Sequence, residues 1–537
     1  MKLITSAAYI SSEFASELGR LPPSFLPVGN KRLYSYQVDW MSLSGGDVYL
    51  SLPESFILND FDEKLLADLG VTILWVPDDV SLGESIMYCW NLTGKSYDSL
   101  QVLHGDTLFL GLREPCLDSF SVHPNSGYYQ RASVSGGETR NSISDVWAGE
   151  HESVLSGYFS FSDPHSLVKS IIQSGGNFIA AVEKYVDSHR VSYVSDGTWL
   201  DFGHINSYFR SRSYLTTERA FNDLKITSRV VSKSGLNAEK IAAERNWFSN
   251  LPSALRIHCP VFLNGCNTTD EDGYQLEYLY WMPLNDLYVY GDLGAKSWRS
   301  IFEASKTVLE DFSTFKPLNI DNIDITVFDA LYLPKTLDRL EKFCDDSELD
   351  LDTRIDLGDN FGTVSVREMA VRSSEFIAPA TSEQAAIAHG DFCFSNVLYD
   401  SRINAIKVID PRGIDNSGEF TLYGDKRYDL AKLYHSVVGL YDFIIAGRYN
   451  LPEDRASAFS ISFPCENRIR DIEKEFRKVF FSHGDISEIE ILAINVHLFL
   501  SMLPLHYDRP DRQRAMLANA GRLYIKLEKL VREHTYS

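Results

Sequence analysis

Two aspartates and one asparagine lie close together in the C-terminal half of the chain. Asp391 belongs to the segment IAHGDFCFSNVLYD, Asn396 follows five residues later, and Asp410 lies in the next segment, IKVIDPRG. Phosphoryl transfer needs a carboxylate to orient and deprotonate the attacking hydroxyl, and oxygen ligands for the Mg²⁺ that neutralises the triphosphate. The spacing therefore predicts a catalytic loop in which Asp391 meets the acceptor and Asn396 and Asp410 bind the metal.

A lysine and a glutamate upstream fit the same chemistry. Lys233 ends a strand-like run, and Glu244 follows in the helix-like stretch 238–250. A lysine that holds the α- and β-phosphates of ATP and pairs with a helix glutamate is the arrangement expected of a kinase. We therefore predict that Lys233 and Glu244 bind the nucleotide, although no glycine-rich phosphate loop precedes Lys233.

The C-terminal segments resemble those of the aminoglycoside phosphotransferase and choline kinase family, whose hallmark H-G-D-x-x-x-x-N is followed by I-D. That family has the protein-kinase fold but phosphorylates small molecules, and Gly390 favours it because protein kinases have arginine at this position. The resemblance covers about 217–537. It implies that His389 braces the catalytic loop, that Asp429 supports this loop, and that adenine binds near 274–282.

The N-terminal half contains three segments that resemble, in order, those of sugar-phosphate nucleotidyltransferases: LPPSFLPVGNKRL at 21–33, VLHGDT at 102–107 and WLDFGHINSY at 199–208. The resemblance covers about 1–215. It implies attack of a phosphate oxygen on the α-phosphorus of a second nucleoside triphosphate, with pyrophosphate as the leaving group. Asp106 and Asp201 take the places of the family's Mg²⁺-binding carboxylates, and the end of a parallel strand is an expected place for a ligand site.

The N-terminal half also departs from this family. The family's opening L-A-A-G-x-G-x-R is replaced by SAAYISSE at 6–13, and its P-K lysine aligns with Pro23. Lys31 and Arg32 are the nearby cations that we assign to the nucleotide, with Arg20 and Lys184 as further candidates. Two interpretations stay open: the domain is active with rearranged cations, or it has kept the fold and lost the chemistry.

The elements that position these residues fall into two predicted domains. The first, 1–215, alternates strand-like and helix-like stretches, which predicts an α/β, Rossmann-like domain with a mostly parallel sheet. Its strand-like runs are Leu3–Ile4, Val71–Val76, Gln101–Leu103 and Phe178–Val182, and its helix-like stretches include Phe61–Leu69 and His165–Ser174.

The second predicted domain, 216–537, is α+β and two-lobed, like a protein kinase. A small lobe at about 217–285 contains the strand-like runs Ile226–Ser232 and Tyr274–Met282 and the helix-like stretch Ala238–Asn250. A larger and mainly helical lobe occupies about 286–537.

The composition restricts the class of protein. The 537 residues are 44% hydrophobic and 23% charged, with a net charge of −23, as in a folded soluble protein. An acidic chain is a poor candidate for binding nucleic acid or an anionic membrane surface. No run of about 18 residues is wholly apolar, so we expect no transmembrane helix. The seven scattered cysteines form no CxxC pair, so neither a disulfide framework nor a zinc site is expected. We expect a cytoplasmic protein.

Together the two halves predict a bifunctional enzyme that uses Mg²⁺, ATP and a second nucleoside triphosphate. The kinase would phosphorylate a sugar, an alditol or a choline-like alcohol, and the nucleotidyltransferase would activate the phosphate. Fusions of this order resemble enzymes that supply precursors of capsule and lipopolysaccharide. The alternatives are a kinase with an inactive N-terminal domain and a non-catalytic nucleotide sensor; the acceptor, the base and the oligomeric state are left open.

Overall fold

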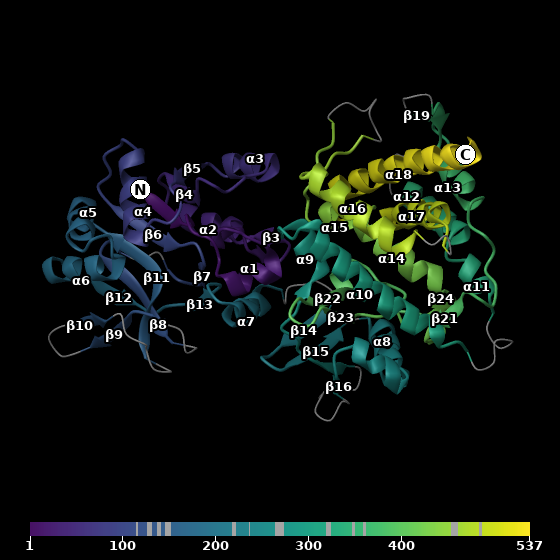
Figure 1. The fold of residues 1–537 in the computed structure, drawn as a ribbon, viewed down its shortest axis with the longest axis horizontal. Coiled ribbons are helices and arrows are strands. Elements are labelled where there is room, and N and C mark those ends of the chain that lie inside the picture. Colours follow the sequence, from purple (N-terminus) through teal and green to yellow (C-terminus); the bar gives the residue numbers. More distant parts are fainter. Residues whose placement is uncertain are drawn as a thin grey trace. The chain divides into compact units, whose positions relative to one another are not determined.

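The computed structural model describes residues 1–537 except 114–115, 126–130, 137–140, 145–151, 217–221, 236, 264–272, 318–323, 346–349, 358–360, 453–459, 483–485 and 537. It divides into two compact units (Figure 1). Unit 1 comprises Met1–Thr216 with the short segment Tyr290–Asp292, and unit 2 comprises Thr217–Val289 with Leu293–Ser537.

Unit 1 is built on a sheet with a parallel centre. The strands β6 (Leu100–His104), β1 (Lys2–Thr5), β4 (Val48–Pro53) and β5 (Val71–Val76) lie side by side in this order, and each neighbouring pair is parallel. On the other side of β6, the long strand β11 (Ser153–Phe161) is antiparallel. The parallel centre confirms the prediction of a Rossmann-like α/β domain, and the antiparallel strands extend it at one edge.

The remaining strands of unit 1 extend this edge or form small separate pairs. The strands β8 (Ser119–Pro124), β9 (Ser133–Gly136), β10 (Asn141–Ser144) and β12 (Ser192–Val194) belong to the main sheet, whereas β2 (Pro27–Val28) pairs with β3 (Lys31–Arg32) and β7 (Thr107–Leu110) pairs with β13 (Thr198–Asp201). The helices are α1 (Ser12–Leu18), α2 (Leu33–Ser42), α3 (Asp60–Asp68), α4 (Leu82–Leu92), α5 (Pro164–Gln173), α6 (Phe178–Ser188) and α7 (Ile205–Thr216).

The expected strand at 178–182 is wrong, because this segment begins the helix α6. Asn177 caps the helix by accepting a hydrogen bond from the amide of Ala180. Phe178, Ala181, Val182 and Tyr185 are all buried, and their spacing places them on one helical face. The short apolar run FIAAV is therefore one turn of an amphipathic helix.

Unit 2 begins with a small antiparallel sheet. Its order is β14 (Asn222–Ile226), β15 (Val230–Gly235), β17 (Tyr274–Glu277) and β16 (Phe262–Leu263), and α8 (Ala238–Asn250) follows β15 in the chain. The single strand expected at 226–232 is instead two strands joined by a turn, in which the Thr227 hydroxyl accepts hydrogen bonds from the amides of Arg229 and Val230. A threonine side chain that bonds nearby amides favours a turn over a continuous strand.

The rest of unit 2 is mainly helical. Short strand pairs hold the loops of interest: β21 (Ala385–Ile387) with β24 (Tyr423–Asp425), and β22 (Val397–Asp400) with β18 (Met282–Pro283) and β23 (Ala405–Val408). The helices are α9 (Leu284–Val289), α10 (Ala295–Thr314), α11 (Thr326–Asp329), α12 (Leu333–Asp345), α13 (Val366–Ser374), α14 (Lys426–Val437), α15 (Tyr441–Ile445), α16 (Glu466–Phe480), α17 (Glu488–Met502) and α18 (Pro510–Tyr536).

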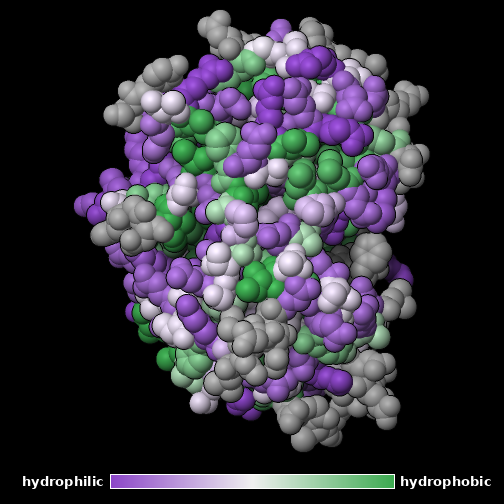
Figure 2. Space-filling view, turned by 90° about the vertical axis from the view of Figure 1, so that its right-hand side faces the viewer, coloured by the Kyte–Doolittle hydropathy of each residue, from purple (hydrophilic) through white to green (hydrophobic). Residues whose placement is uncertain are grey.

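Helix α17 is part of the core of unit 2. Among the described residues, Glu488–His506 is the one segment long and apolar enough to cross a membrane. However, 67% of the apolar stretch within this segment is buried inside the structure. In Figure 2, apolar residues form separate patches on a surface where hydrophilic residues predominate. The burial of α17 is that of a core helix.

Candidate functional site

The loop between β21 and β22 holds Asp391 and Asn396 in contact with each other. The amide nitrogen Nδ2 of Asn396 donates hydrogen bonds to the carboxylate Oδ2 and to the carbonyl of Asp391, each at 3.0 Å. The amide of Ile409 donates to the carbonyl of Asn396 at 3.0 Å, which connects the loop to the end of β23 just before Asp410. Hydrogen bonds therefore fix the orientation of the Asp391 carboxylate.

His389 and Asp429 hold the backbone of this loop. The Nε2 of His389 donates to the carbonyl of Ile409 at 2.9 Å, while its Nδ1 accepts the amide of Asp391 at 3.3 Å. Burial lowers the pKa of His389, so the ring is neutral and can act as donor and acceptor together. The Asp429 carboxylate accepts the amides of His389 and Gly390, both at 2.7 Å, and burial raises its pKa to about 7.

Lys233 lies between two carboxylates. Its Nζ is 2.6 Å from Oε2 of Glu244 and 3.0 Å from Oδ1 of Asp410, and the Tyr274 hydroxyl also donates to Glu244 Oε2. Burial alone would lower the pKa of Lys233, but the charges of Asp410 and Glu244 raise it above its usual value. Because the Glu244 side chain is fully buried whereas that of Asp410 is 31% exposed, Asp410 is the carboxylate that a ligand can reach.

The sequence analysis missed Lys432, whose Nζ lies 2.8 Å from Oδ1 of Asp391. Burial tends to raise the pKa of Asp391, but the positive charge of Lys432 outweighs it and holds this pKa below its usual value. Lys432 follows Asp429 by three residues on α14, so both side chains lie on one helical face. This spacing is the signal that could have found it.

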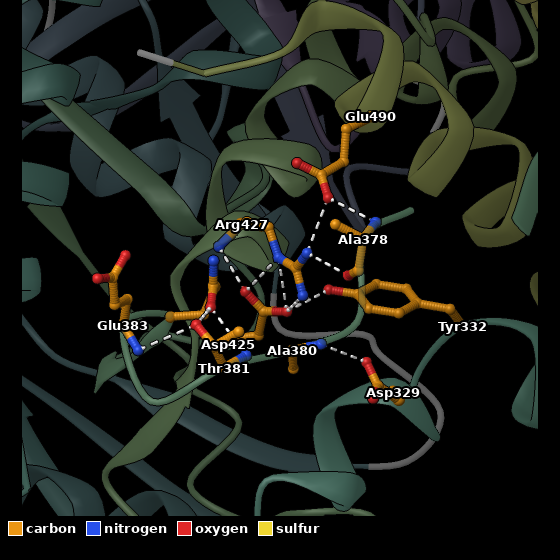
Figure 3. Close-up of polar contacts among 10 residues, drawn as sticks. Asp329, Tyr332, Ala378, Ala380, Thr381, Glu383, Asp425, Arg427 and Glu490 are labelled. Carbon is orange, nitrogen blue, oxygen red and sulfur yellow. Dashed lines mark hydrogen bonds and ion pairs between the residues drawn. The ribbon is translucent and has the colours of Figure 1, made fainter. Parts of the chain in front are cut away.

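A buried network fixes the start of α14, the helix that carries Asp429 and Lys432 (Figure 3). The Arg427 guanidinium bonds to the Asp425 carboxylate at 2.7 Å and to Glu490 at 2.8 Å. The hydroxyl of Tyr332 donates to the same oxygen of Asp425, also at 2.7 Å. Since Asp425 also caps α14, the network sets the position of the helix beneath the catalytic loop.

The donor set of this site fits Mg²⁺ bound together with a nucleotide. Asp410 offers carboxylate oxygens and Asn396 an amide oxygen, and hard oxygen donors are those that Mg²⁺ prefers. Within the described part of the chain, no group of three or more His, Cys, Asp or Glu side chains is arranged to hold a metal alone. Mg²⁺ bound here would take its remaining ligands from phosphate oxygens and water.

In unit 1 the structure brings Asp106 and Asp201 together across Gly203. A Cβ added to Gly203 would lie 2.5 Å from Oδ2 of Asp106 and 3.3 Å from Oδ1 of Asp201, so a larger residue would displace the carboxylates. The amide of Gly203 donates to Asp201 at 3.0 Å. Burial, and then the charge of Asp201, raise the pKa of Asp106 to about 6. Two facing carboxylates of this kind can share a divalent cation with a triphosphate.

The basic side chain that lies at the paired carboxylates of unit 1 is Arg131, not one of the predicted cations. Arg131, which the sequence analysis did not select, forms an ion pair with Asp201 and lies 4.6 Å from the ring centroid of Trp199. Lys31 is exposed, with its Nζ 5.4 Å from the ring of Tyr36. Arg32 is buried, and its guanidinium donates to the carbonyls of Phe25 and Tyr290, both at 2.7 Å.

No protein-family model matches the chain, and no curated protein matches it. Solved structures similar to it include a nucleoside-diphosphate-sugar pyrophosphorylase from Vibrio cholerae RC9, with 11% identity, a TM-score of 0.34, and coverage of 40% of this chain and 99% of that one. An inositol-1-phosphate CTP transferase from T. maritima has 15% identity and a TM-score of 0.32, covering 41% and 97%. A CTP:phosphocholine cytidylyltransferase from Streptococcus pneumoniae has 12% identity and a TM-score of 0.32, covering 40% and 98%.

Proposed function

We propose that the protein is a bifunctional cytoplasmic enzyme that phosphorylates a small hydroxylated molecule with ATP and then joins the phosphate to a nucleotide for surface-polysaccharide synthesis. The observation that carries the proposal is the buried ion pair between Lys233 and Glu244, which extends to Asp410 at 3.0 Å. This arrangement pairs a phosphate-binding cation with a candidate metal ligand, as phosphoryl transfer requires.

In the kinase step, Lys233 binds the phosphates of ATP. Asn396 and Asp410 would hold Mg²⁺, which would supply positive charge to neutralise the phosphates. Asp391 accepts a hydrogen bond from the acceptor hydroxyl and directs its oxygen at the γ-phosphorus. The new P–O bond forms as the bond to the bridging oxygen breaks, ADP leaves, and the hydroxyl proton passes to Asp391. Because Lys432 lowers the pKa of Asp391, this carboxylate is a weak base that takes the proton late, which suits a loose transition state.

In the second step, an oxygen of the new phosphate attacks the α-phosphorus of a second nucleoside triphosphate, and pyrophosphate leaves. Asp106 and Asp201 would hold Mg²⁺, which would supply positive charge to the two anionic reactants. The pairing of these two carboxylates across Gly203 supports this role. Arg131 lies at Asp201 and is a candidate donor to the leaving pyrophosphate.

A second candidate function is a kinase with a catalytically inactive unit 1, and the position of Arg32 favours it. The Arg32 guanidinium is engaged by two backbone carbonyls and lies 3.6 Å from the carboxylate of Asp62. Moving it to a triphosphate would leave these buried groups without their partner. The exposed Lys31 is the only one of the two predicted cations that could reach a nucleotide without this cost.

One mass-spectrometric assay tests both steps. The purified protein is incubated with Mg²⁺, ATP, the other nucleoside triphosphates, and a pool of sugars, alditols, their acids and choline. The proposal expects a nucleotide-linked product, which Asp391→Asn abolishes at the first step and Asp106→Asn at the second. Matched substitutions of exposed aspartates, Asp508→Asn and Asp68→Asn, should leave both steps intact.

Each outcome of this assay selects one function. A phosphorylated product with no nucleotide conjugate, even when candidate phosphates are supplied directly, would establish the kinase with an inactive unit 1. Nucleotide binding with no product from any acceptor would favour the nucleotide sensor. Release of pyrophosphate by Asp106→Asn at the wild-type rate would contradict the assignment of the unit 1 site.

A further inference from the structure

Three cationic side chains gather beside the catalytic loop of unit 2, around Tyr428. Lys335 and Arg339 lie one turn apart on α12, and the Nζ of Lys335 is 5.8 Å from the Tyr428 ring centroid. Arg412 packs against Gly390, since a Cβ added there would lie 2.7 Å from the Arg412 Cβ. We call Lys335, Arg339 and Arg412 the cationic cluster.

No carboxylate pairs with the cationic cluster among the described residues. Arg339 donates to the carbonyl of Ser501 at 3.0 Å and Arg412 to the Asn416 side chain at 2.7 Å, and neither forms an ion pair within the described part of the chain. Lys335 likewise has no acidic partner among the residues that the structure describes. In a chain of net charge −23, three neighbouring cations with no counter-ion among the described residues are unexpected, because half-buried charges are costly unless they are paired.

The electrostatics of the cationic cluster show the same excess of positive charge. Burial is the main reason that the pKa of Lys335 falls to about 8, and the charges of Arg412 and Arg339 lower it further. Burial tends to raise the pKa of Tyr428, yet the charges of Lys335 and nearby cations bring it below its usual value. A site with these properties binds an anion more readily than a neutral or cationic group.

A pocket opens next to the cationic cluster. It is lined by His389 and Gly390 of the catalytic loop, by Arg412 and Tyr428, and on its apolar side by Phe328. Of the cationic cluster, Arg412 lines the pocket, and the lining residue Gly390 directly precedes Asp391 in the chain.

Two acidic residues also line the pocket, and both are already engaged. The Asp425 carboxylate is paired with Arg427 at 2.7 Å. The Asp415 carboxylate accepts the amides of Ser417 at 2.8 Å and Glu419 at 3.0 Å within its own turn. Neither neutralises the cationic cluster.

We propose that the phosphate acceptor of unit 2 carries an oxyanion, a carboxylate or a phosphate ester, in addition to its reacting hydroxyl. The oxyanion binds Lys335, Arg339 and Arg412 beside Tyr428, while the hydroxyl meets Asp391. This inference rests on the proposed kinase function and narrows its acceptor: amines such as choline are repelled, and neutral polyols leave the cationic cluster unpaired.

The first test measures binding without turnover. The full-length protein is saturated with Mg²⁺ and a non-hydrolysable ATP analogue, which fills the nucleotide site, and inorganic phosphate and glycerate are titrated by calorimetry. Loss of a charged hydrogen-bond partner should weaken binding about ten-fold or more in Lys335→Gln. Lys335→Arg keeps the charge and should retain binding, and Lys342→Gln, an exposed position on the same helix, should behave like the wild type.

The second test compares acceptors matched in all but charge: glycerol, glycerate and glycerol 3-phosphate, and ribitol with its acid and its phosphate. We expect kcat/KM to be at least about ten-fold higher for either the acids or the phosphates than for the neutral acceptors. The preferred class identifies the oxyanion as a carboxylate or a phosphate. This preference should vanish in Lys335→Gln. Equal or faster phosphorylation of neutral acceptors or of choline would overturn the inference and leave the kinase function standing. Anion binding that depends on Lys335, without phosphorylation of any acceptor, would instead overturn the kinase function and keep the anion site.

Discussion

The ion pair between Lys432 and Asp391 leads to a quantitative prediction about the catalytic loop. The Lys432 Nζ lies 2.8 Å from Asp391 Oδ1, and the two side chains are 11% and 40% exposed. Lys432→Met removes the charge and keeps the length of the side chain, and Asp391→Asn removes the opposite charge. We expect the effects of the two substitutions on the free energy of unfolding to be coupled.

The magnitude of this coupling follows from the geometry. Unit charges about 4 Å apart interact by about 4 kcal/mol at an effective dielectric constant of about 20. Because Asp391 is 40% exposed, solvent screening reduces this figure, and we expect about 1–3 kcal/mol.

The coupling should depend on pH with a defined sign. The pKa of Asp391 is lowered in the folded protein, so the stabilisation by this carboxylate is present above its unfolded pKa of about 3.9. It is lost as the pH falls through the lower, folded value. The coupling measured at pH 7 should therefore shrink on acidification below about pH 4, and the acid limb of the kinase pH profile should move to higher pH in Lys432→Met.

The assay is urea denaturation of the wild type, the two single variants and the double variant, followed by tryptophan fluorescence. The buried Trp247, which donates to the carbonyl of Ala388 at 2.9 Å, contributes a signal from the base of the loop. The control is the exposed pair Lys342 and Asp338, 2.7 Å apart, for which we expect a coupling below about 0.5 kcal/mol. Additivity within about 0.5 kcal/mol for Lys432 and Asp391 would refute the reasoning.

Three further predictions concern other groups of the two sites. Glu244→Gln should weaken ATP binding about ten-fold in a fluorescent-nucleotide titration, because a neutral amide no longer holds Lys233, whereas Glu239→Gln, at an exposed position of the same helix, should not. Burial raises the pKa of Asp429 to about 7. The stabilisation from this group is therefore complete below its unfolded pKa and is lost as the pH rises through about 7. The urea midpoint should fall more between pH 6 and 8 in the wild type than in Asp429→Asn. Since the pKa of Asp106 is about 6, Mg²⁺-dependent nucleotide binding to unit 1, measured by calorimetry, should weaken as the pH falls through 6, and an unchanged affinity at pH 5 would contradict its role as a metal ligand.

The sequence predicted most where local pattern and chemistry agree. The helix predicted at 238–250 has those bounds in the structure, and the strand at 71–76 likewise. The run at 178–182 was misassigned because periodicity cannot separate a short buried strand from one turn of a helix. The feature that distinguishes the helix is Asn177, whose side chain caps its first turn.

The cations of the sites were harder to predict, because their partners are distant in the sequence. Lys432 meets Asp391 from another element, and Arg131 meets Asp201 across 70 residues. Nothing in the immediate neighbourhood of Arg131 indicates a carboxylate partner, whereas Lys432 could have been found from its position one turn after Asp429. Long-range pairing depends on the packing of elements, which short motifs do not contain.

Three of the candidate carboxylates share one electrostatic feature. Asp391 is paired with Lys432, Asp410 with Lys233, and Asp201 with Arg131. A magnesium nucleotide would bring a divalent cation for Asp410 and Asp201. It would also bring phosphate oxygens for their partners Lys233 and Arg131, so in these two pairs each side chain can exchange its partner for a ligand of the same charge. Binding by exchange leaves no buried charge without a counter-ion, and a buried charge that loses its partner is the costly state in a closed site. Among the described residues the cationic cluster at Lys335 has no acidic partner, so an anionic acceptor would complete the pattern there.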